Sequence, residues 1–504
     1  MKVLTLADVI EGVAGVRLPE WGQPVSRTVI DSRQAEPGAL FVALKGERAD
    51  GHEYVADAFS RGAVAAIIER QVQAEALVLD LTETDHGAHG AGREFSIPVL
   101  IRVVDSLQAL QQAATFWRQQ HPDLRVIGIT GSVGKTTTKE LAAAVLARRY
   151  VTLKSEASYN NEIGLPLTLL HLTGGHERAV LEMGMYDVGE IADLTRIGQP
   201  QVGVVTIIGP VHLERAGSIE RIVAAKTELV AALPAAPDGV AILNYDDEQV
   251  RGMARATEAQ VFYYGLSPEA DLWADEIEGL GLEGIRFQLH YCLGGKSRRS
   301  APVSMKRPAL ARGEVCETLH VRIPLLGRHS VHTALRAAAV GLVEGLTWQE
   351  IIEGLRGPSA QLRLVAVSGP EGSIILDDTY NASPASTIAA LNLLEELDGR
   401  RIAVLGDMLE LGDYEREGHE KVGLRALEVT DVLIAVGERG RVIGETALRW
   451  GMPAERVHIV AENRAVIELL EGMVTGNDVI LVKGSRGLRM EEIVFALSRD
   501  VGKR

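Results

Sequence analysis

A glycine-rich turn between an apolar strand and a helix is the feature that most constrains the fold of this chain. Residues 128–137 read GITGSVGKTT and join the strand pattern LRVIGIT to the helical pattern KTTTKELAAAVLARRY. A strand entering such a turn and a helix leaving it are the context that a phosphate-binding loop requires. Glycines allow positive φ and close backbone approach, and a helix N-terminus offers unpaired N–H groups. The stretch therefore predicts a nucleotide site in an α/β domain.

The spacing of the glycines departs from the common loop G-x-x-x-x-G-K-[ST]. Here the glycines fall at positions 128, 131 and 134. Lys135 can still reach the β- and γ-phosphates of a nucleotide, and the Thr136 hydroxyl can bind Mg²⁺. The alternative is an ordinary glycine turn with an incidental lysine. The coincidence of strand, turn, Gly-Lys-Thr and helix favours the phosphate loop.

The length and composition indicate an acidic globular protein of several domains. The chain has 504 residues, which corresponds to about three domains at the usual domain size. A net charge of −16 argues against non-specific binding to nucleic acid. Two cysteines are typical of a reducing compartment, and neither a signal peptide nor a run of 18 apolar residues is visible. We therefore expect a cytoplasmic protein with no membrane insertion.

Three regions with different sequence textures predict three α/β domains. Residues 1–105 mix short strands and helices, which predicts a small α/β domain. Residues 106–357 alternate apolar strands with helices around the glycine turn, which predicts a P-loop domain with a mostly parallel sheet. Residues 358–504 repeat a strand–helix unit, typical of a doubly wound, Rossmann-like domain.

Ligands of doubly wound sheets bind at the carboxyl ends of the strands, so polar residues there are candidates for a site. Asp377, Asp378, Asp407, Glu438 and Lys483 follow apolar strand patterns in the third region.

Two polar segments are predicted to be loops. The first, 81–96, contains two histidines, but no further ligands cluster near them, so a metal site is disfavoured. The second, 294–314, is basic and contains proline and serine. A solvated loop is the simpler interpretation of it, and a phosphate-binding patch is the alternative.

A nucleotide site implies Mg²⁺, and three residues of the central region are candidates for its surroundings. Glu182 ends an apolar strand and could equally be a helix cap. His212 follows another strand, where a lone histidine is more often structural. Lys226 lies on a helix of mixed character, and by composition alone it would be a surface lysine.

The order of these motifs resembles the central ATPase domain of the Mur ligases, a family that includes folylpolyglutamate synthetase. Its members share a shorter loop, T-G-x-x-G-K-[ST], which is found here at Thr130 to Thr136. The opening motif DSRQAEPGALFVALKG resembles the uridine-nucleotide-binding domain of the third and fourth Mur ligases. The later motifs LDDTYNASPAS, LGDMLELG and VKGSRGLRMEE resemble the fourth. The resemblance covers nearly the whole chain and explains the glycine spacing.

The resemblance implies an ATP-dependent amide ligase of peptidoglycan precursor synthesis. The expected substrates are ATP, UDP-N-acetylmuramoyl-tripeptide and D-alanyl-D-alanine, and the expected intermediate is an acyl phosphate. Two Mg²⁺ ions and a carbamylated Lys226 are expected as cofactors, in a monomer. The third residue of the tripeptide, diaminopimelate or lysine, stays open.

The resemblance also assigns roles to individual residues. The nucleotide and its metal would be held by Thr130, Gly131, Ser132, Val133, Gly134, Lys135, Thr136, Thr137, Asn244, Arg363 and Asp378, with Glu182, His212 and carbamylated Lys226 as further metal ligands. Lys135, Glu182, His212 and Lys226 would carry the catalysis. The other substrates would contact Asp31, Ser32, Arg33, Asn160, Asn161, Tyr380, Asn381, Lys483, Ser485 and Arg486.

Some positions depart from the family pattern. Ser330 and Thr333 stand where two asparagines are usual, which puts an adenine contact in doubt. Met185 begins the sequence MYD where Ala-Asn-His is more usual, and Ser383 stands where asparagine would be. The alternatives are the third Mur ligase, a folylpolyglutamate synthetase, or a P-loop switch or motor protein. The first and last domains argue against all three.

Overall fold

The computed structural model describes residues 2–46, 49–82, 96–211, 213–293, 315–357 and 364–498. Most of the predicted loop 81–96 and all of the loop 294–314 lie outside these residues. His212 and Arg363 also lie outside the described residues, so their proposed roles stay predictions.

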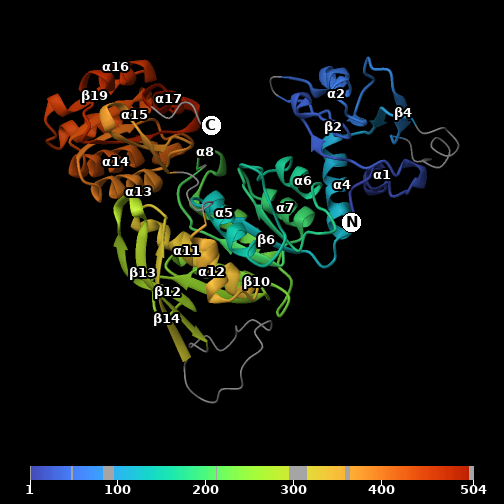
Figure 1. Ribbon diagram of the computed structural model, residues 1–504, viewed down its shortest axis with the longest axis horizontal. Helices are drawn as coiled ribbons and strands as arrows, with labels where there is room; N and C mark the ends of the chain where they lie inside the picture. Colours follow the sequence, from blue (N-terminus) through green and yellow to red (C-terminus); the bar gives the residue numbers. More distant parts are fainter. Residues whose placement is uncertain are drawn as a thin grey trace.

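The chain folds into three α/β domains, each built on its own sheet, as predicted (Figure 1). The N-terminal and C-terminal domains lie at opposite ends of the long axis, with the central domain between and below them in this view. No helix in the described ranges is long and apolar enough to cross a membrane.

The N-terminal sheet has five parallel strands in the order β1-β2-β3-β5-β4. Its first helix, α1, packs on α4 at the start of the predicted central region, and one apolar core runs through both. The predicted boundary at residue 105 therefore stays a prediction. The elements are α1 Leu6–Ala14, β1 Thr28–Val29, β2 Leu40–Val42, α2 Val55–Ser60, β3 Ala65–Ile68, β4 Leu77–Asp80, β5 Val99–Arg102 and α4 Ser106–Gln119.

The central sheet has nine strands in the order β14-β13-β12-β11-β10-β9-β6-β8-β7. Strands β6 to β12 are parallel, and β13 and β14 extend the sheet in antiparallel fashion. The strands are β6 Arg125–Thr130, β7 Thr152–Lys154, β8 Arg178–Glu182, β9 Val202–Val205, β10 Val240–Asn244, β11 Gln260–Gly265, β12 Leu272–Gly279, β13 Ile285–Leu293 and β14 Val315–Ile323.

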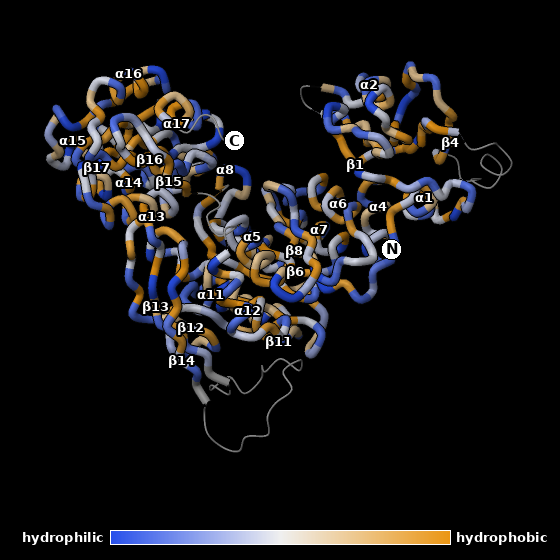
Figure 2. The backbone as a smooth tube through the Cα atoms, viewed as in Figure 1, coloured by the Kyte–Doolittle hydropathy of each residue, from blue (hydrophilic) through white to orange (hydrophobic). Residues whose placement is uncertain are grey.

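Helices cover both faces of this sheet. The inner strands are therefore buried on both sides, which agrees with their continuous apolar sequences. Helices α4, α6, α7 and α9 share one core, and α5, α11 and α12 share the other. Figure 2 shows hydrophobic residues along the inner strands β6 and β8. The helices are α5 Lys135–Leu146, α6 Gly164–Leu169, α7 Glu190–Gly198, α8 Leu213–Ala216, α9 Ile219–Ala231, α10 Glu248–Gly252, α11 Val331–Val343 and α12 Trp348–Leu355.

The C-terminal sheet follows the order β15-β16-β20-β17-β18-β19, with only β15 antiparallel. Helices α13, α14 and α15 cover one face and α16 and α17 the other, which is the predicted doubly wound arrangement. The elements are β15 Val365–Ser368, β16 Ile374–Asp378, α13 Pro384–Glu395, β17 Arg400–Leu405, α14 Glu415–Val429, β18 Val432–Val436, α15 Gly437–Arg449, β19 Val457–Val460, α16 Asn463–Met473, β20 Asp478–Lys483 and α17 Glu491–Leu497.

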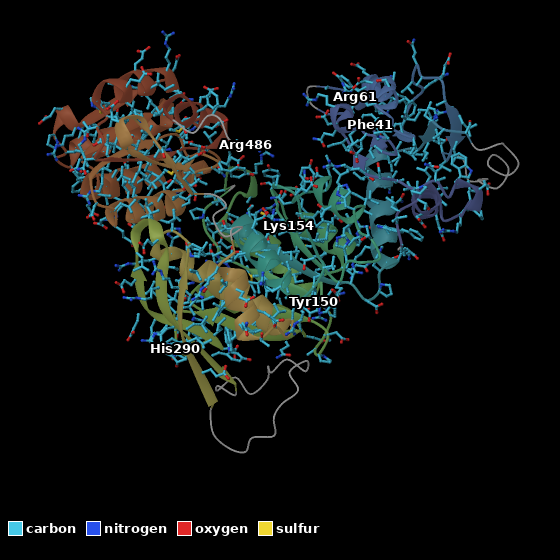
Figure 3. The ribbon with its side chains drawn as sticks, viewed as in Figure 1. Phe41, Arg61, Tyr150, Lys154, His290 and Arg486 are labelled. Atoms are coloured by element: carbon cyan, nitrogen blue, oxygen red, sulfur yellow. The ribbon has the colours of Figure 1, made fainter. Side chains whose placement is uncertain are left out.

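The central and C-terminal domains touch through both apolar and polar contacts. Leu326 packs in the core of the C-terminal domain. Arg328, just before α11, forms an ion pair of 3.2 Å with Glu396, which follows α13. The hydroxyl groups of Ser158 and Tyr380 are hydrogen-bonded to each other. The N-terminal domain, marked by Phe41 and Arg61 in Figure 3, lies apart from Arg486 of the C-terminal domain. The site described below is therefore shared by the central and C-terminal domains.

Candidate functional site

The predicted phosphate loop joins β6 to α5 and depends on two glycines. Gly134 precedes the first residue of α5 with a φ of 85°, in the left-handed region. A Cβ atom on Gly131 would lie 1.8 Å from the Thr206 hydroxyl oxygen, closer than atoms can approach. Both positions therefore need glycine, and the N–H groups at the start of α5 face the cavity described below.

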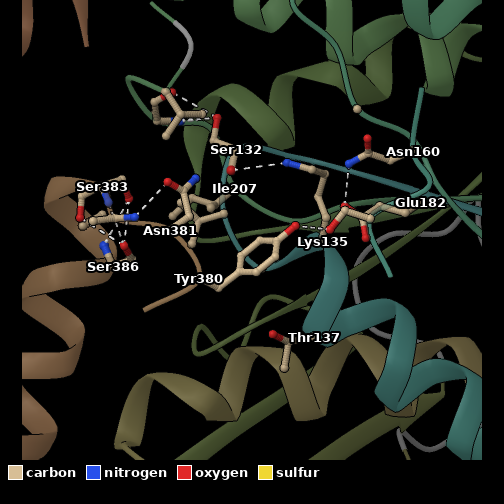
Figure 4. A pocket seen from close by; sticks show the side chains of 18 of the residues that line it. Ser132, Lys135, Thr137, Asn160, Glu182, Ile207, Tyr380, Asn381, Ser383 and Ser386 are labelled. Carbon is tan, nitrogen blue, oxygen red and sulfur yellow. Dashed lines mark hydrogen bonds between the residues drawn. The ribbon is translucent and has the colours of Figure 1, made fainter. Parts of the chain in front are cut away.

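Lys135 and Thr136 open helix α5 at the end of this turn. The Lys135 ammonium donates a 2.9 Å hydrogen bond to the Gly131 carbonyl, so it lies over the loop (Figure 4). The Thr136 hydroxyl donates a 2.8 Å hydrogen bond to Oε2 of Glu182, at the end of the neighbouring strand β8. The Lys135 ammonium thus lies where the terminal phosphates would bind, and the Thr136 and Glu182 oxygens lie where their metal ion would bind.

Glu182 is buried and fixed on both carboxylate oxygens. Its Oε1 accepts a 2.9 Å hydrogen bond from the Asn160 amide, while Oε2 bonds to Thr136. The buried Lys139 ammonium lies 4.0 Å from Oε2 and also donates to the Ser155 carbonyl. A carboxylate offers the oxygen ligands that Mg²⁺ prefers, so Glu182 can serve as a hard oxygen ligand.

The residues present fit a magnesium ion that takes most of its ligands from phosphate and water and only a few from the protein. Within the described ranges, no three His, Cys, Asp or Glu side chains gather closely enough to hold a metal alone. Mg²⁺ usually takes one or two protein oxygens and fills its octahedron with phosphates and water. Thr136 and Glu182 supply such a pair beside the phosphate loop.

Lys226 on α9 is fully buried, which corrects the expectation from composition of a surface lysine. Burial, and then the charge of Lys135, hold the pKa of the Lys226 amine well below its usual value. No hydrogen bond to another described side chain holds this amine, although it lines the same cavity as Glu182. A neutral amine is thus available for chemistry.

The C-terminal domain contributes the opposite wall of the site. Lys483, at the end of β20, donates to Oδ2 of Asp378 at 2.6 Å and to the Asn381 carbonyl at 2.9 Å. The Tyr380 hydroxyl is hydrogen-bonded to the Ser158 hydroxyl of the central domain, and Arg486 lies 5.8 Å from the Tyr380 ring. Parallel strands β16 and β20 end side by side, so their last residues meet.

A region beyond the loop is lined by neutral polar groups, by the cation Arg336 and by the carboxylates Asp246 and Asp247. The Asn244 amide donates to the Thr206 carbonyl at 3.2 Å. Burial, and then the charge of Arg336, lower the pKa of His332 to about 4. Ser330 and Thr333, the two departures from the family pattern, also lie here. The hydrogen-bonding groups of this wall suit the polar edge of a nucleotide base.

One cavity of about 1370 Å³ joins all these parts. This is larger than the roughly 300–1,000 Å³ of an ordinary ligand pocket, so more than one substrate fits. Of the residues predicted from sequence, it is lined by Ser132, Val133, Gly134, Lys135, Thr137, Asn160, Asn161, Glu182, Lys226, Asn244, Asp378, Tyr380, Asn381, Lys483, Ser485 and Arg486.

Some predicted residues lie elsewhere or have structural contacts. Asp31, Ser32 and Arg33 form a short turn in the N-terminal domain, where Arg33 pairs with Asp31 at 2.7 Å, outside this cavity. Asn161 caps α6 by accepting from Gly164 N. Asp407 accepts from the first N–H groups of α15 and does not line the cavity.

The cavity also contains residues that were not predicted from sequence. Arg336 is a single charge within the apolar helix α11, and that isolation was a usable signal. Ser158 and Tyr186 lie in loops of ordinary polar composition, where no signal distinguished them. Lys139 does not line the cavity, but it follows Lys135 by four residues and lies beneath Glu182 on the same side of α5.

The comparisons with known proteins agree with this arrangement. Family models described as the Mur ligase family catalytic domain, the Mur ligase middle domain, and the Mur ligase glutamate ligase domain match residues 24–118, 129–341 and 362–486.

Curated relatives named UDP-N-acetylmuramoyl-tripeptide–D-alanyl-D-alanine ligase match almost from end to end. The protein from Bacillus subtilis is 35% identical over 98% of this chain and 97% of its own length. The protein from Escherichia coli is 34% identical over 93% of each chain.

Solved structures match as well. A crystal structure of MurF from Acinetobacter baumannii superposes with a TM-score of 0.78 at 29% identity, covering 98% of this chain and 99% of that one. MurF ligase from Thermotoga maritima, in complex with ADP, gives a TM-score of 0.70 at 26% identity, over 93% and 96%.

Proposed function

Because this chain belongs to the Mur ligase family, we propose that it is an ATP-dependent ligase that joins D-alanyl-D-alanine to UDP-N-acetylmuramoyl-tripeptide. One observation carries the proposal beyond family membership. The phosphate loop with its Thr136–Glu182 pair opens into the same cavity as Asp378 and Lys483 of the C-terminal domain. ATP, a carboxylate and an amine can therefore meet in one place.

The proposed reaction proceeds in two steps. A carboxylate oxygen of the tripeptide attacks the γ-phosphorus of ATP, the bond to ADP breaks, and an acyl phosphate forms. The amine of D-alanyl-D-alanine then attacks the acyl carbon, and inorganic phosphate and a proton leave. Both steps bring anions together, so fixed positive charges such as Lys135 lower their barriers.

Thr136 and Glu182 would hold one Mg²⁺, and His212 and carbamylated Lys226 would complete a second metal site. Such ions would supply positive charge against the negative charge that develops during phosphoryl transfer. The support lies in the 2.8 Å contact between the Thr136 and Glu182 oxygens.

The carbamate on Lys226 would form when its neutral amine attacks the carbon of CO₂ and releases a proton. Only the unprotonated amine can do this, and burial lowers the pKa of Lys226. The product replaces a buried neutral amine with an anion. An anion suits a metal site.

The remaining predicted residues keep their proposed roles. Asn244 would approach the adenine, Asp378 the ribose and Arg363 a phosphate, whereas Asp31, Ser32 and Arg33 would bind the uridine nucleotide. Tyr380, Asn381, Lys483, Ser485 and Arg486 would line the dipeptide and acyl end. We propose 1–105, 106–357 and 358–504 as the domains for the uridine substrate, ATP and the dipeptide.

We also propose that the enzyme acts as a cytoplasmic monomer without nucleic acid. Two cysteines in 504 residues support a reducing compartment, and a net charge of −16 disfavours nucleic-acid binding.

Phosphate release with different co-substrates tests the proposal. We expect release only when UDP-N-acetylmuramoyl-tripeptide and D-alanyl-D-alanine are both present with ATP. Diaminopimelate or glutamate in place of the dipeptide should give none. Robust release with ATP alone would indicate a switch or motor protein, and release with glutamate would indicate another ligase of the family.

A further inference from the structure

Arg336 is a buried cation without an acidic partner in the wall of the cavity. It lies on α11 and is 5% exposed. Its Nε donates to the Thr138 hydroxyl at 2.8 Å, and one terminal nitrogen donates to the Thr333 hydroxyl at 2.8 Å. No carboxylate among the described residues forms an ion pair with it. The Tyr264 ring lies 5.8 Å from the guanidinium carbon.

The guanidinium group of arginine is a permanent cation in proteins. A buried charge without an opposite charge is unfavourable, and hydroxyl groups compensate only part of the cost. The charge also acts on its surroundings, since it helps to keep His332 neutral. The arrangement therefore suits an anionic ligand in the cavity.

The contacts of Arg336 lead directly to the phosphate loop. Thr138, which accepts from Arg336, donates its own proton to the Gly134 carbonyl at 2.7 Å. The guanidinium also lies over Gly134, where one of its nitrogens would be 3.1 Å from an added Cβ. Arg336 thus supports Gly134, the residue of the turn with left-handed backbone conformation, through Thr138 and by direct contact.

The second contact fixes the Thr333 hydroxyl. Its oxygen accepts from Arg336, which leaves its proton for another acceptor, and no hydrogen bond donated by Thr333 is found among the described residues. Thr333 lines the cavity beside Asn244 and Ser330. A ligand in this part of the cavity can therefore accept from the Thr333 hydroxyl.

We propose that Arg336 is a positioning residue of the nucleotide site, which braces the turn at Gly134 through Thr138 and presents the Thr333 hydroxyl to the bound nucleotide. This inference rests on the proposed function for its ligand, ATP. It adds a charged group on α11 to a site that also draws on the loop, β8, α9, β10 and the C-terminal domain.

Calorimetric titration with ADP tests the proposal on the full chain without requiring ligation. Arg336→Met should weaken ADP binding by roughly tenfold or more, as expected when a charged donor is lost. Arg336→Lys should recover part of the loss, because it keeps the charge but loses the two-pronged geometry. In steady-state assays, the KM for ATP should rise while the KM for the dipeptide stays constant.

A double variant separates positioning from general destabilisation. Thr138→Val breaks the relay to Gly134, so Arg336→Met combined with Thr138→Val should bind ADP no more weakly than Arg336→Met alone. The matched control is Arg118→Lys, a buried arginine that bonds only to carbonyls outside the cavity. It should lower the melting temperature and leave ADP affinity unchanged.

Two results would overturn the proposal: unchanged ADP affinity in folded Arg336→Met, or losses that simply add in the double variant. If Arg336→Met does not fold, Arg336→Lys and Thr138→Val decide by the same criteria. If the wild-type protein binds ADP but does not ligate the two substrates, that result counts against the proposed function and not against the role of Arg336.

Discussion

The Thr136 hydroxyl and the Glu182 carboxylate lie 2.8 Å apart across two neighbouring strands, β6 and β8. Thr136 belongs to the helix that follows β6, and Glu182 ends β8, so strand pairing fixes their separation. The Asn160 amide holds the second oxygen of Glu182. The pair is thus built into the sheet, and a metal bound there needs little rearrangement of the protein.

Glu182→Gln should weaken magnesium binding by about 10- to 100-fold, the usual range for disturbing a metal site. The amide is neutral and offers one oxygen where the carboxylate offers two. The measurement is the magnesium concentration that gives half-maximal phosphate release. Glu344→Gln is the control, because Glu344 is a buried carboxylate paired with Arg125 outside the cavity. An unchanged magnesium dependence in Glu182→Gln would refute the proposed ligand.

Lys226→Ala should lower kcat by on the order of a hundredfold, the usual effect of removing one group that stabilises developing charge. If the active form is a carbamate, acetate should restore part of the rate to Lys226→Ala. Acetate should not restore Glu182→Gln, which retains Lys226. Turnover of Lys226→Ala equal to that of the wild type would contradict a carbamate role.

His332 should make the folded state less stable in acid. Its pKa is lowered to about 4, whereas an unfolded histidine titrates near 6.5. Between these values the unfolded state binds more protons, so stability falls as pH drops from 6.5 toward 4. The contribution of His332 is fully present above pH 6.5. His332→Gln should therefore flatten the dependence of the urea midpoint on pH over this window.

Asp271→Asn provides a comparison of opposite sign. Burial raises the pKa of Asp271 to about 6 from an ordinary value of 3.8. The folded state then holds the extra proton between these values, so Asp271 lowers stability as pH rises through them. Replacing Asp271 should steepen the fall in the free energy of unfolding that His332 causes at low pH.

An identical pH dependence of the urea midpoint in the wild type and His332→Gln would show that His332 does not contribute.

Binding of a non-hydrolysable ATP analogue should draw the C-terminal domain toward the central domain. Asp378 and the phosphate loop lie on opposite walls of the cavity, and one nucleotide must contact both. The Ser158–Tyr380 contact already links the two walls. Small-angle scattering should show a smaller radius of gyration with the analogue than without it. An unchanged radius would argue against closure.

The sequence predicted the parts of the site that depend on local pattern. The strand–turn–helix at Gly134 and the strand ends at Asp378 and Lys483 follow from periodicity and from the topology of parallel sheets. Burial of Lys226 was missed, although it lies four residues after Ile222 and three before Leu229, on the same helical face. A lysine on a mixed helix is usually exposed, and only tertiary packing reveals this exception.

Other features depend on how distant segments pack, and the sequence could not predict them. Arg336 reaches Thr138 across 198 residues, and Tyr380 reaches Ser158 across 222. The sequence analysis did not predict strands β12 to β14. Their register depends on pairing with one another and with the parallel sheet.

The central claim is that ATP activates a carboxylate, and transfer of labelled oxygen tests it most directly. The tripeptide substrate is prepared with ¹⁸O in its terminal carboxylate and incubated with ATP and D-alanyl-D-alanine. If an acyl phosphate forms and the amine displaces phosphate, each released phosphate carries one oxygen from that carboxylate. Mass spectrometry should find this label in the phosphate. Phosphate that takes its new oxygen only from water would contradict the account.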